Sequence, residues 1–199
     1  SASFFIVGCL INQNSQIELQ NININPTRNG ILLALRKMGA KINLKNKRYV
    51  NNEQIADIYV ESSDLKGCEL DISFANLMID EYPILSIAAA FADSPSIFKG
   101  LKELRVKESN RLELIKTNLL RCGCYCEIKG DDLFINPLKK INNIENKITT
   151  NFDHRIAMAF SIMGTKIGNL VIQDNQSIKT SFPNFVNEFN KAGGNIIEK

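Results

Sequence analysis

Apolar residues follow two different patterns along this chain, and the two patterns alternate. Three stretches are apolar at nearly every position: residues 1–12, 82–91 and 154–163. A helix that is apolar on all sides belongs in the interior of a protein, so we expect three buried helices. Three other stretches carry apolar residues at helical spacing among polar ones, which predicts amphipathic helices: residues 31–38, 109–120 and 184–191.

Short stretches with the character of strands separate these helices. They are residues 16–20, 41–44, 58–61, 96–100, 125–128, 133–136, 170–172 and 195–197. A polar connection joins residues 41–44 to 58–61, and residues 129–132 form a hairpin turn between two later strands. Short strands are also expected before the second and third apolar helices, at residues 69–72 and 147–150.

The order of these elements repeats three times. Each amphipathic helix stops at a glycine, at Gly39, Gly123 and Gly193, and the chain divides into copies at about residues 1–68, 69–146 and 147–199. Repeats of this kind bury their apolar faces against each other. We therefore expect an α+β fold, an inside-out α/β prism of βαβαββ units with helices inside and sheets outside. The first and third copies are incomplete, so we expect one prism domain over residues 1–199, a fragment of a longer protein.

Composition and charge narrow the class of protein. The chain has 199 residues and 24 Lys and Arg against 21 Asp and Glu, which is too balanced for a dedicated nucleic-acid binder. The apolar runs are too short to cross a bilayer, and no secretory signal is visible. An odd count of five cysteines favours reduced thiols, so we expect a cytoplasmic protein that binds neither nucleic acid nor membrane.

Three cysteines, Cys122, Cys124 and Cys126, lie close together in sequence. Their C-x-C-x-C spacing differs from the C-x-x-C pairs of zinc sites, and the single histidine, His154, is remote in sequence. We interpret them as small buried side chains and expect no metal site.

Residues 104–114 form a charged entry to the second amphipathic helix, with Ser109 as the expected N-cap. Lys107, Glu108 and Arg111 lie near the mouth of this helix, where an anion such as phosphate is favoured. Glu108 is a candidate acid or base at such a site. The alternative is a solvated helix start with mixed charges.

Two further candidate groups occupy matching places in the repeats. Asp80 precedes the second apolar helix, and Asp153, His154 and Arg155 begin the third. Each alone has a structural explanation, because the aspartates are potential helix caps and His154 a potential core residue. Together with Lys107, Glu108 and Arg111 they would meet at one end of the prism, and their chemistry suits group transfer on a phosphorylated anion.

Several segments resemble signature blocks of the enolpyruvylshikimate-phosphate (EPSP) synthase family. They are Asp80-Glu81-Tyr82-Pro83-Ile84-Leu85, Leu104-Arg105-Val106-Lys107-Glu108-Ser109, Asp153-His154-Arg155-Ile156-Ala157-Met158, Asn25-Pro26-Thr27-Arg28 and Thr180-Ser181-Phe182-Pro183. The order and spacing of these blocks also match, and the resemblance covers the whole chain.

This resemblance implies a two-domain enzyme built of two such prisms, of which the chain is most of the C-terminal one. The family transfers the carboxyvinyl group of phosphoenolpyruvate to the 5-hydroxyl of shikimate 3-phosphate and releases phosphate. It uses no metal or organic cofactor. The expected partners are these two substrates and the missing N-terminal domain, without which the chain should turn over negligibly.

The resemblance also implies roles for single residues. Asp80 would act as base toward the shikimate hydroxyl, Lys107 would contact the shikimate phosphate, and Glu108 would exchange a proton with the methylene carbon of phosphoenolpyruvate. Arg111 and Arg155 would clamp the phosphate and carboxylate of phosphoenolpyruvate, with His154 nearby. Two positions depart from the family pattern, because Asn110 replaces a usual Asp and Thr180 a usual Lys, with Lys179 one residue earlier.

Two alternatives have different consequences. A UDP-N-acetylglucosamine carboxyvinyltransferase shares the prism type but should lack the Asp153-His154-Arg155 block. A non-catalytic prism that serves as a binding module would not need Glu108 and Asp80 beside arginines.

Overall fold

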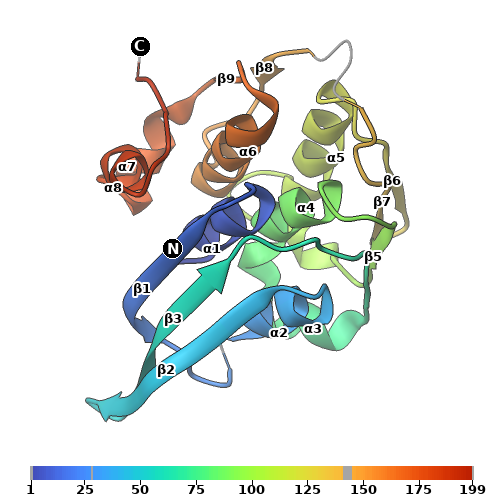
Figure 1. Cartoon of the computed structure of the whole chain (residues 1–199). Helices are drawn as coiled ribbons and strands as arrows, with labels where there is room; N and C mark the ends of the chain where they lie inside the picture. The colour runs from blue at the N-terminus through green and yellow to red at the C-terminus, as the bar shows by residue number, and fades with distance from the viewer. Residues whose placement is uncertain (1, 28, 141–144, 199) are drawn as a thin grey trace.

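The computed structural model describes residues 2–27, 29–140 and 145–198 of the chain (Figure 1). Its first part contains α1 (Ala2–Ile11), β1 (Gln16–Asn23), α2 (Gly30–Lys37), β2 (Lys41–Val50), β3 (Glu53–Glu61), β4 (Glu69–Leu70), α3 (Ile72–Met78) and the 3₁₀ helix η1 (Ile79–Glu81). The middle contains α4 (Tyr82–Ala90), β5 (Ser96–Phe98), the 3₁₀ helix η2 (Lys102–Val106), α5 (Arg111–Arg121), β6 (Cys126–Lys129) and β7 (Asp132–Ile135). The last part contains β8 (Lys147–Ile148), α6 (His154–Ile167), β9 (Val171–Ile172), the 3₁₀ helix η3 (Asn175–Ser177), α7 (Ile178–Ser181) and α8 (Phe185–Lys191).

The three apolar helices α1, α4 and α6 pack against one another in the centre of the molecule. Their N-terminal ends meet, because Glu81, directly before α4, accepts hydrogen bonds from Ser3 of α1 and Arg155 of α6. The C-terminal ends of α1 and α6 also meet, since Asn12 Nδ2 donates to Thr165 Oγ1 at 2.8 Å. The central helices are therefore parallel, and the prediction of three buried helices is confirmed.

The sheets lie outside this helical core. The first sheet has the order β1-β3-β2, the second β4-β5-β7-β6, and the third consists of β8 and β9. Each sheet belongs to one of the three predicted copies. The inside-out prism is confirmed, with apolar helices inside and sheets outside (Figure 1).

The amphipathic helices of the three predicted copies end with the same backbone geometry. After α2, α5 and α8 a glycine adopts a positive φ, of 86° at Gly39, 78° at Gly123 and 98° at Gly193. The residue after each glycine donates its N–H to a carbonyl five positions back, at 2.9–3.0 Å in all three copies. This is the hydrogen-bonding pattern of a left-handed helix C-cap, where glycine avoids the strain of a β-carbon.

The first hairpin is longer than the sequence predicts. Instead of strands at 41–44 and 58–61 joined by a polar connection, β2 and β3 pair from Lys41 and Glu61 to Val50 and Glu53. Asn51 and Asn52 form the turn with φ values of 48° and 64°, as a two-residue type I′ turn requires. Residues 45–48 are all polar, so apolar alternation gave no signal there.

Three other expectations are corrected. The second amphipathic helix begins at Arg111, not Ser109, and its N-cap is Asn110, whose Oδ1 accepts from Glu113 N at 3.2 Å. Residues 195–197 do not form a strand, and Ile72 begins the unpredicted helix α3 instead of ending a strand.

The prediction that Cys122, Cys124 and Cys126 are buried is confirmed, and all three thiols are free. Burial raises the pKa of each of them to about 12. In the described ranges, no group of three or more His, Cys, Asp or Glu side chains could hold a metal ion. A search of the same residues finds no helix with the length and apolar character needed to span a membrane.

Candidate active site

Arg111 lies at the centre of an ionic cluster at the N-terminal ends of α5 and α6. Its side chain is 1% exposed and donates to three carboxylates. Nε bonds Asp153 Oδ2 at 2.8 Å, Nη1 bonds Asp80 Oδ1 at 2.8 Å, and Nη2 bonds Glu108 Oε2. Since a guanidinium has a rigid set of N–H donors, this arrangement fixes the positions of all three carboxylates.

Asp153 is the buried member of the cluster. Its Oδ1 caps α6 by accepting from the backbone N–H of Arg155 at 2.9 Å and of Ile156 at 3.3 Å. Its Oδ2 accepts from Ser109 Oγ at 2.8 Å and from Arg111. Burial acts to raise the pKa of Asp153, but Arg111, Ser109 and the cap outweigh it, so this pKa lies below its usual value. The Ser109 hydroxyl therefore hydrogen-bonds Asp153 and does not cap α5.

Asp80 and Glu108 are the exposed members, with side chains 45% and 51% accessible. Lys107 extends the cluster on this side, with Nζ 3.6 Å from Asp80 Oδ1 and a hydrogen bond to Glu103. The bond to Glu103 raises the pKa of Lys107. Asp80 thus accepts from an arginine instead of capping a helix, and it faces solvent between two cations.

Arg155 lies on the other side of Asp80. Its Nη1 donates to the backbone carbonyl of Asp80 at 2.9 Å and to Glu81 Oε1 at 3.1 Å. Glu81 also accepts from Ser3 Oγ, which links the starts of all three central helices at one carboxylate. Arg155 is therefore held in place while 23% of its side chain remains exposed.

His154 is partly buried beside the same groups. Burial lowers the pKa of His154, and the positive charges of Arg155 and Arg111 lower it further against the opposing effect of Asp153 and Glu108. A neutral imidazole is thus favoured at pH 7.

The structure brings together the candidate residues of the predicted active site. Five of them are joined by hydrogen bonds or ion pairs, and His154 lies next to them: Asp80, Lys107, Glu108, Arg111 and Arg155. Arg28 lies outside the described residues. Lys179 pairs with Glu198 at 3.6 Å and is exposed on α7. Sequence reasoning missed Glu81, Ser3 and Glu103, and only Glu81 had a signal, as the neighbour of Asp80.

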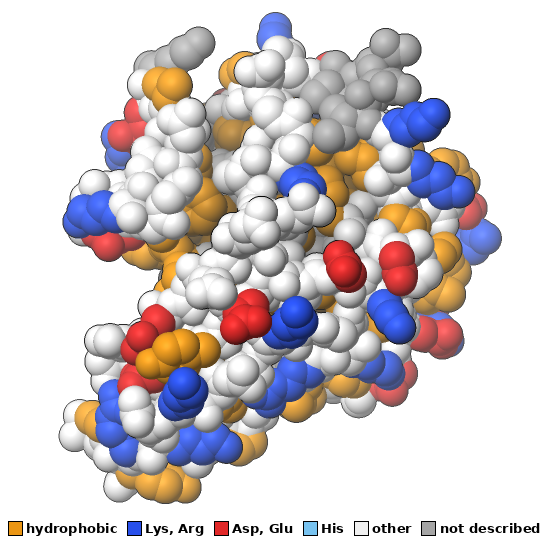
Figure 2. Space-filling view, in the orientation of Figure 1, with side chains coloured by type: hydrophobic (Ala, Val, Ile, Leu, Met, Phe, Trp, Pro, Cys, Tyr) orange, Lys and Arg blue, Asp and Glu red, His pale blue; other side chains and the backbone are white. Residues whose placement is uncertain are grey.

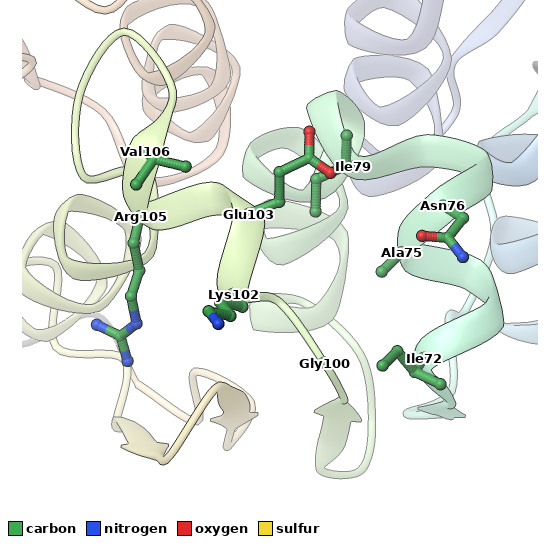
Figure 3. A pocket seen from close by; sticks show the side chains of 9 residues that line it. All are labelled: Ile72, Ala75, Asn76, Ile79, Gly100, Lys102, Glu103, Arg105 and Val106. Atoms are coloured by element: carbon green, nitrogen blue, oxygen red, sulfur yellow. The ribbon is translucent and has the colours of Figure 1, made fainter.

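A groove of about 440 Å³ borders the cluster between α3 and η2 (Figure 3). Ile72, Ala75 and Ile79 line one side, and Lys102, Glu103 and Val106 the other. Glu103, which extends toward Ile79 in Figure 3, is also the partner of Lys107. The groove therefore opens beside the exposed edge of the cluster.

Comparisons with solved structures agree with this fold. EPSP synthase from Acinetobacter baumannii superposes with a TM-score of 0.90 at 36% identity, over 96% of this chain and 44% of that one. The enolpyruvyl transferase NikO from Streptomyces tendae gives a TM-score of 0.77 at 13% identity, which shows a shared fold alone.

Curated relatives are similar over nearly the whole chain. A 3-phosphoshikimate 1-carboxyvinyltransferase from Paramagnetospirillum magneticum is 43% identical over 98% of the chain, and one from a Chelativorans species is 42% identical over 100%. The chain spans less than half of their length, at 44% and 45%. The family model described as EPSP synthase (3-phosphoshikimate 1-carboxyvinyltransferase) matches residues 1–189. The chain therefore belongs to the EPSP synthase family.

Proposed function

We propose that the protein containing this chain transfers the carboxyvinyl group of phosphoenolpyruvate to the 5-hydroxyl of shikimate 3-phosphate in the cytoplasm. The observation that carries this proposal is the cluster in which Arg111 fixes Asp80 and Glu108 beside Lys107 and Arg155. Exposed carboxylates between fixed cations suit proton transfer next to a bound oxyanion.

The proposed reaction has two steps, an addition and an elimination. Asp80 accepts the proton of the hydroxyl as its oxygen bonds to the central carbon of phosphoenolpyruvate, while Glu108 gives a proton to the methylene carbon. In the second step phosphate leaves with the proton that Asp80 had accepted, and Glu108 takes back a proton from the new methyl group. Arg155 and Lys107 hold the substrate anions, and neutral His154 lies beside them.

Arg111 has a different position from the other cations. Three of its N–H donors are engaged by carboxylates, and its side chain is 1% exposed. It can therefore bind a substrate anion only when Asp80 or Glu108 moves aside. We propose that its main role is to hold both carboxylates in position.

The test measures phosphate release from phosphoenolpyruvate and shikimate 3-phosphate by the full-length protein, or by this chain mixed with the missing half. Glu108→Gln should lower kcat by about 10²- to 10⁴-fold. Glu113→Gln is the matched control, because Glu113 lies only five residues from Glu108, on α5, and pairs with Lys116 at 3.1 Å outside the cluster. A wild-type rate for Glu108→Gln and Arg155→Ala would contradict the site.

The same assay separates the alternatives. With UDP-N-acetylglucosamine in place of shikimate 3-phosphate, the proposal expects no phosphate release. A non-catalytic prism domain would give no phosphate release with either shikimate 3-phosphate or UDP-N-acetylglucosamine.

A further inference from the structure

Each of the three central helices contains a buried serine. Ser86 of α4 and Ser161 of α6 each donate the hydroxyl hydrogen, at 2.8 Å, to the carbonyl four residues earlier in the same helix. This is a common way for a helix to satisfy a buried hydroxyl. Ser3 of α1 differs, because its Oγ donates to Oε2 of Glu81, which directly precedes α4. Ser3 therefore joins two helices, whereas the hydroxyls of the other two serines bond within one.

The Glu81 carboxylate receives this bond because it takes no part in its own helix. Glu81 occupies the N-cap position of α4, but in the described part of the chain its side chain makes no capping bond. Its Oε2 accepts from Ser3, and its Oε1 accepts from Arg155 Nη1 at 3.1 Å. Each carboxylate oxygen thus has its own donor, and a carboxylate held at both oxygens cannot rotate as freely as one held at a single oxygen.

Arg155 contacts Glu81 through only one nitrogen of its guanidinium. Nη1 donates to Glu81 and to the backbone carbonyl of Asp80, at 3.1 and 2.9 Å. Within residues 2–27, 29–140 and 145–198, neither Nε nor Nη2 of Arg155 has a partner. These two nitrogens form a donor pair that can bind a carboxylate or a phosphate through two parallel hydrogen bonds. Glu81 therefore orients a guanidinium whose other side is available for a substrate anion.

The contact between Ser3 and Glu81 is sheltered from solvent. Acidic and basic side chains also lie on the outer surface in Figure 2, where water screens ion pairs and weakens their hold on a geometry. The Glu81 side chain, by contrast, is 20% exposed, and Ser3 is 5% exposed. Because water has little access to this carboxylate, it does not simply replace a lost bond, and the position of Glu81 should depend on Ser3.

We propose that Ser3 is a positioning residue for phosphoenolpyruvate, and that it acts through Glu81 by orienting the Arg155 guanidinium. The inference rests on the proposed function, in which Arg155 binds this substrate. The side chain of Asp80, the proposed base, is held separately by Arg111 at 2.8 Å. Loss of the Ser3 hydroxyl should therefore weaken binding of phosphoenolpyruvate and leave the chemical step nearly unchanged.

The first test measures phosphate release by the full-length protein while each substrate is varied in turn. Ser3→Ala should raise KM for phosphoenolpyruvate about threefold to tenfold and change kcat less than about twofold. KM for shikimate 3-phosphate should stay at its wild-type value. Ser86→Ala is the matched control, because it removes a buried serine hydroxyl that bonds only its own helix, and it should change neither KM. A wild-type KM for phosphoenolpyruvate in Ser3→Ala would overturn the proposal, as would an equal rise in both KM values.

A double-mutant cycle shows whether Ser3 acts through Glu81. Glu81→Ala removes the carboxylate, so adding Ser3→Ala should then change KM for phosphoenolpyruvate by less than about twofold. Effects of the two substitutions that multiply would show that Ser3 acts by another route and would overturn the proposal.

The same variants separate this inference from the proposed function. A wild-type protein that released no phosphate would contradict the proposed function. The urea unfolding midpoints would still decide the Ser3–Glu81 contact, because residues in contact change stability non-additively. Additive shifts of the midpoint would overturn the contact on which the inference depends.

Discussion

Arg111 Nε donates to Asp153 Oδ2 across 2.8 Å, and the two side chains are 1% and 0% exposed. Asp153 also begins α6 as its cap, so one carboxylate joins two helices and orients the guanidinium that holds Asp80 and Glu108. The exposed half of the candidate site therefore depends on a buried ion pair.

Replacing Asp153 by Asn should destabilise the chain by about 3 kcal/mol, because the substitution leaves a buried arginine short of one carboxylate. Asn is itself a good cap, so the loss would report on charge and not on capping. Asp71→Asn is the matched control at the exposed cap of α3 and should cost much less. Urea unfolding of the three proteins measures the differences, and equal losses would contradict this account.

The contribution of Asp153 should also depend on pH. Its pKa is lowered in the folded protein, so its contribution is full above the unfolded pKa of about 3.9 and is lost as the pH falls through the folded value. The stability difference between wild type and Asp153→Asn should therefore shrink below about pH 4. A difference that stays constant from pH 7 to pH 3 would contradict the assignment.

Much of the fold could be predicted because its strongest signals are local. A helix that is apolar on all sides can only lie inside, and Gly39, Gly123 and Gly193 end helices through backbone conformation alone. The end of the hairpin β2–β3 could not be predicted, because Lys45 to Arg48 give no alternation between a buried and a solvent face. Residues 195–197 have the composition of a strand, but a strand needs a partner strand. In the described residues the backbone of Ile196 instead bonds the side chain of Asn190, with both distances 2.8 Å.

The candidate site could be predicted where its residues are neighbours in sequence, as at Lys107 and Glu108. It could also be predicted where matching places in the repeats bring distant helix starts together, as for Asp80 and Arg155. It could not where a contact joins distant residues that no such pattern marks. Ser3 and Glu81 are 78 positions apart, and no pattern links them before the helices pack. Ser109 looks like a cap in sequence, but the tertiary bond to Asp153 takes its hydroxyl, and Asn110 caps instead.

The single histidine gives a direct measure of the site's electrostatics. Burial, with nearby Arg155 and Arg111, lowers the pKa of His154, so an NMR titration should give a midpoint below 6.5. Protonation then opposes folding, and stability should fall as the pH decreases from about 6.5 toward that midpoint. Arg155→Gln removes one positive charge and should raise the midpoint. A wild-type midpoint at or above 6.5 would contradict the described surroundings.

Two glutamates bind two different cations of the candidate site. Substituting each glutamate in the full-length enzyme and measuring KM for both substrates therefore tests each cation separately. Glu81 holds Arg155, and Glu103 holds Lys107. Under the proposed function, Glu81→Gln should raise KM for phosphoenolpyruvate about tenfold, through loss of a charge-assisted bond to Arg155. Glu103→Gln should instead raise KM for shikimate 3-phosphate.

Each substitution in this pair is the control for the other. A general loss of structure would change both KM values in both variants, and would also lower the unfolding midpoint. If both variants changed both KM values alike while the unfolding midpoint stayed unchanged, the assignment of one cation to each substrate would be wrong.

Asn110 caps α5 in the structure, whereas the sequence predicted Ser109 as the cap. The resemblance described above implies Asp at this position, and the structure gives Asn110 the role of a cap, with Oδ1 accepting from Glu113 N at 3.2 Å. Asn and Asp cap about equally well, so Asn110→Asp should change the free energy of unfolding by less than about 0.5 kcal/mol. Asn110→Ala should cost about 1 kcal/mol, because an N–H of the first turn loses its acceptor.

Ser109→Ala serves as the comparison, since that hydroxyl bonds Asp153 and not the helix. Thermal unfolding at neutral pH measures all three, and a fully stable Asn110→Ala would show that α5 begins elsewhere.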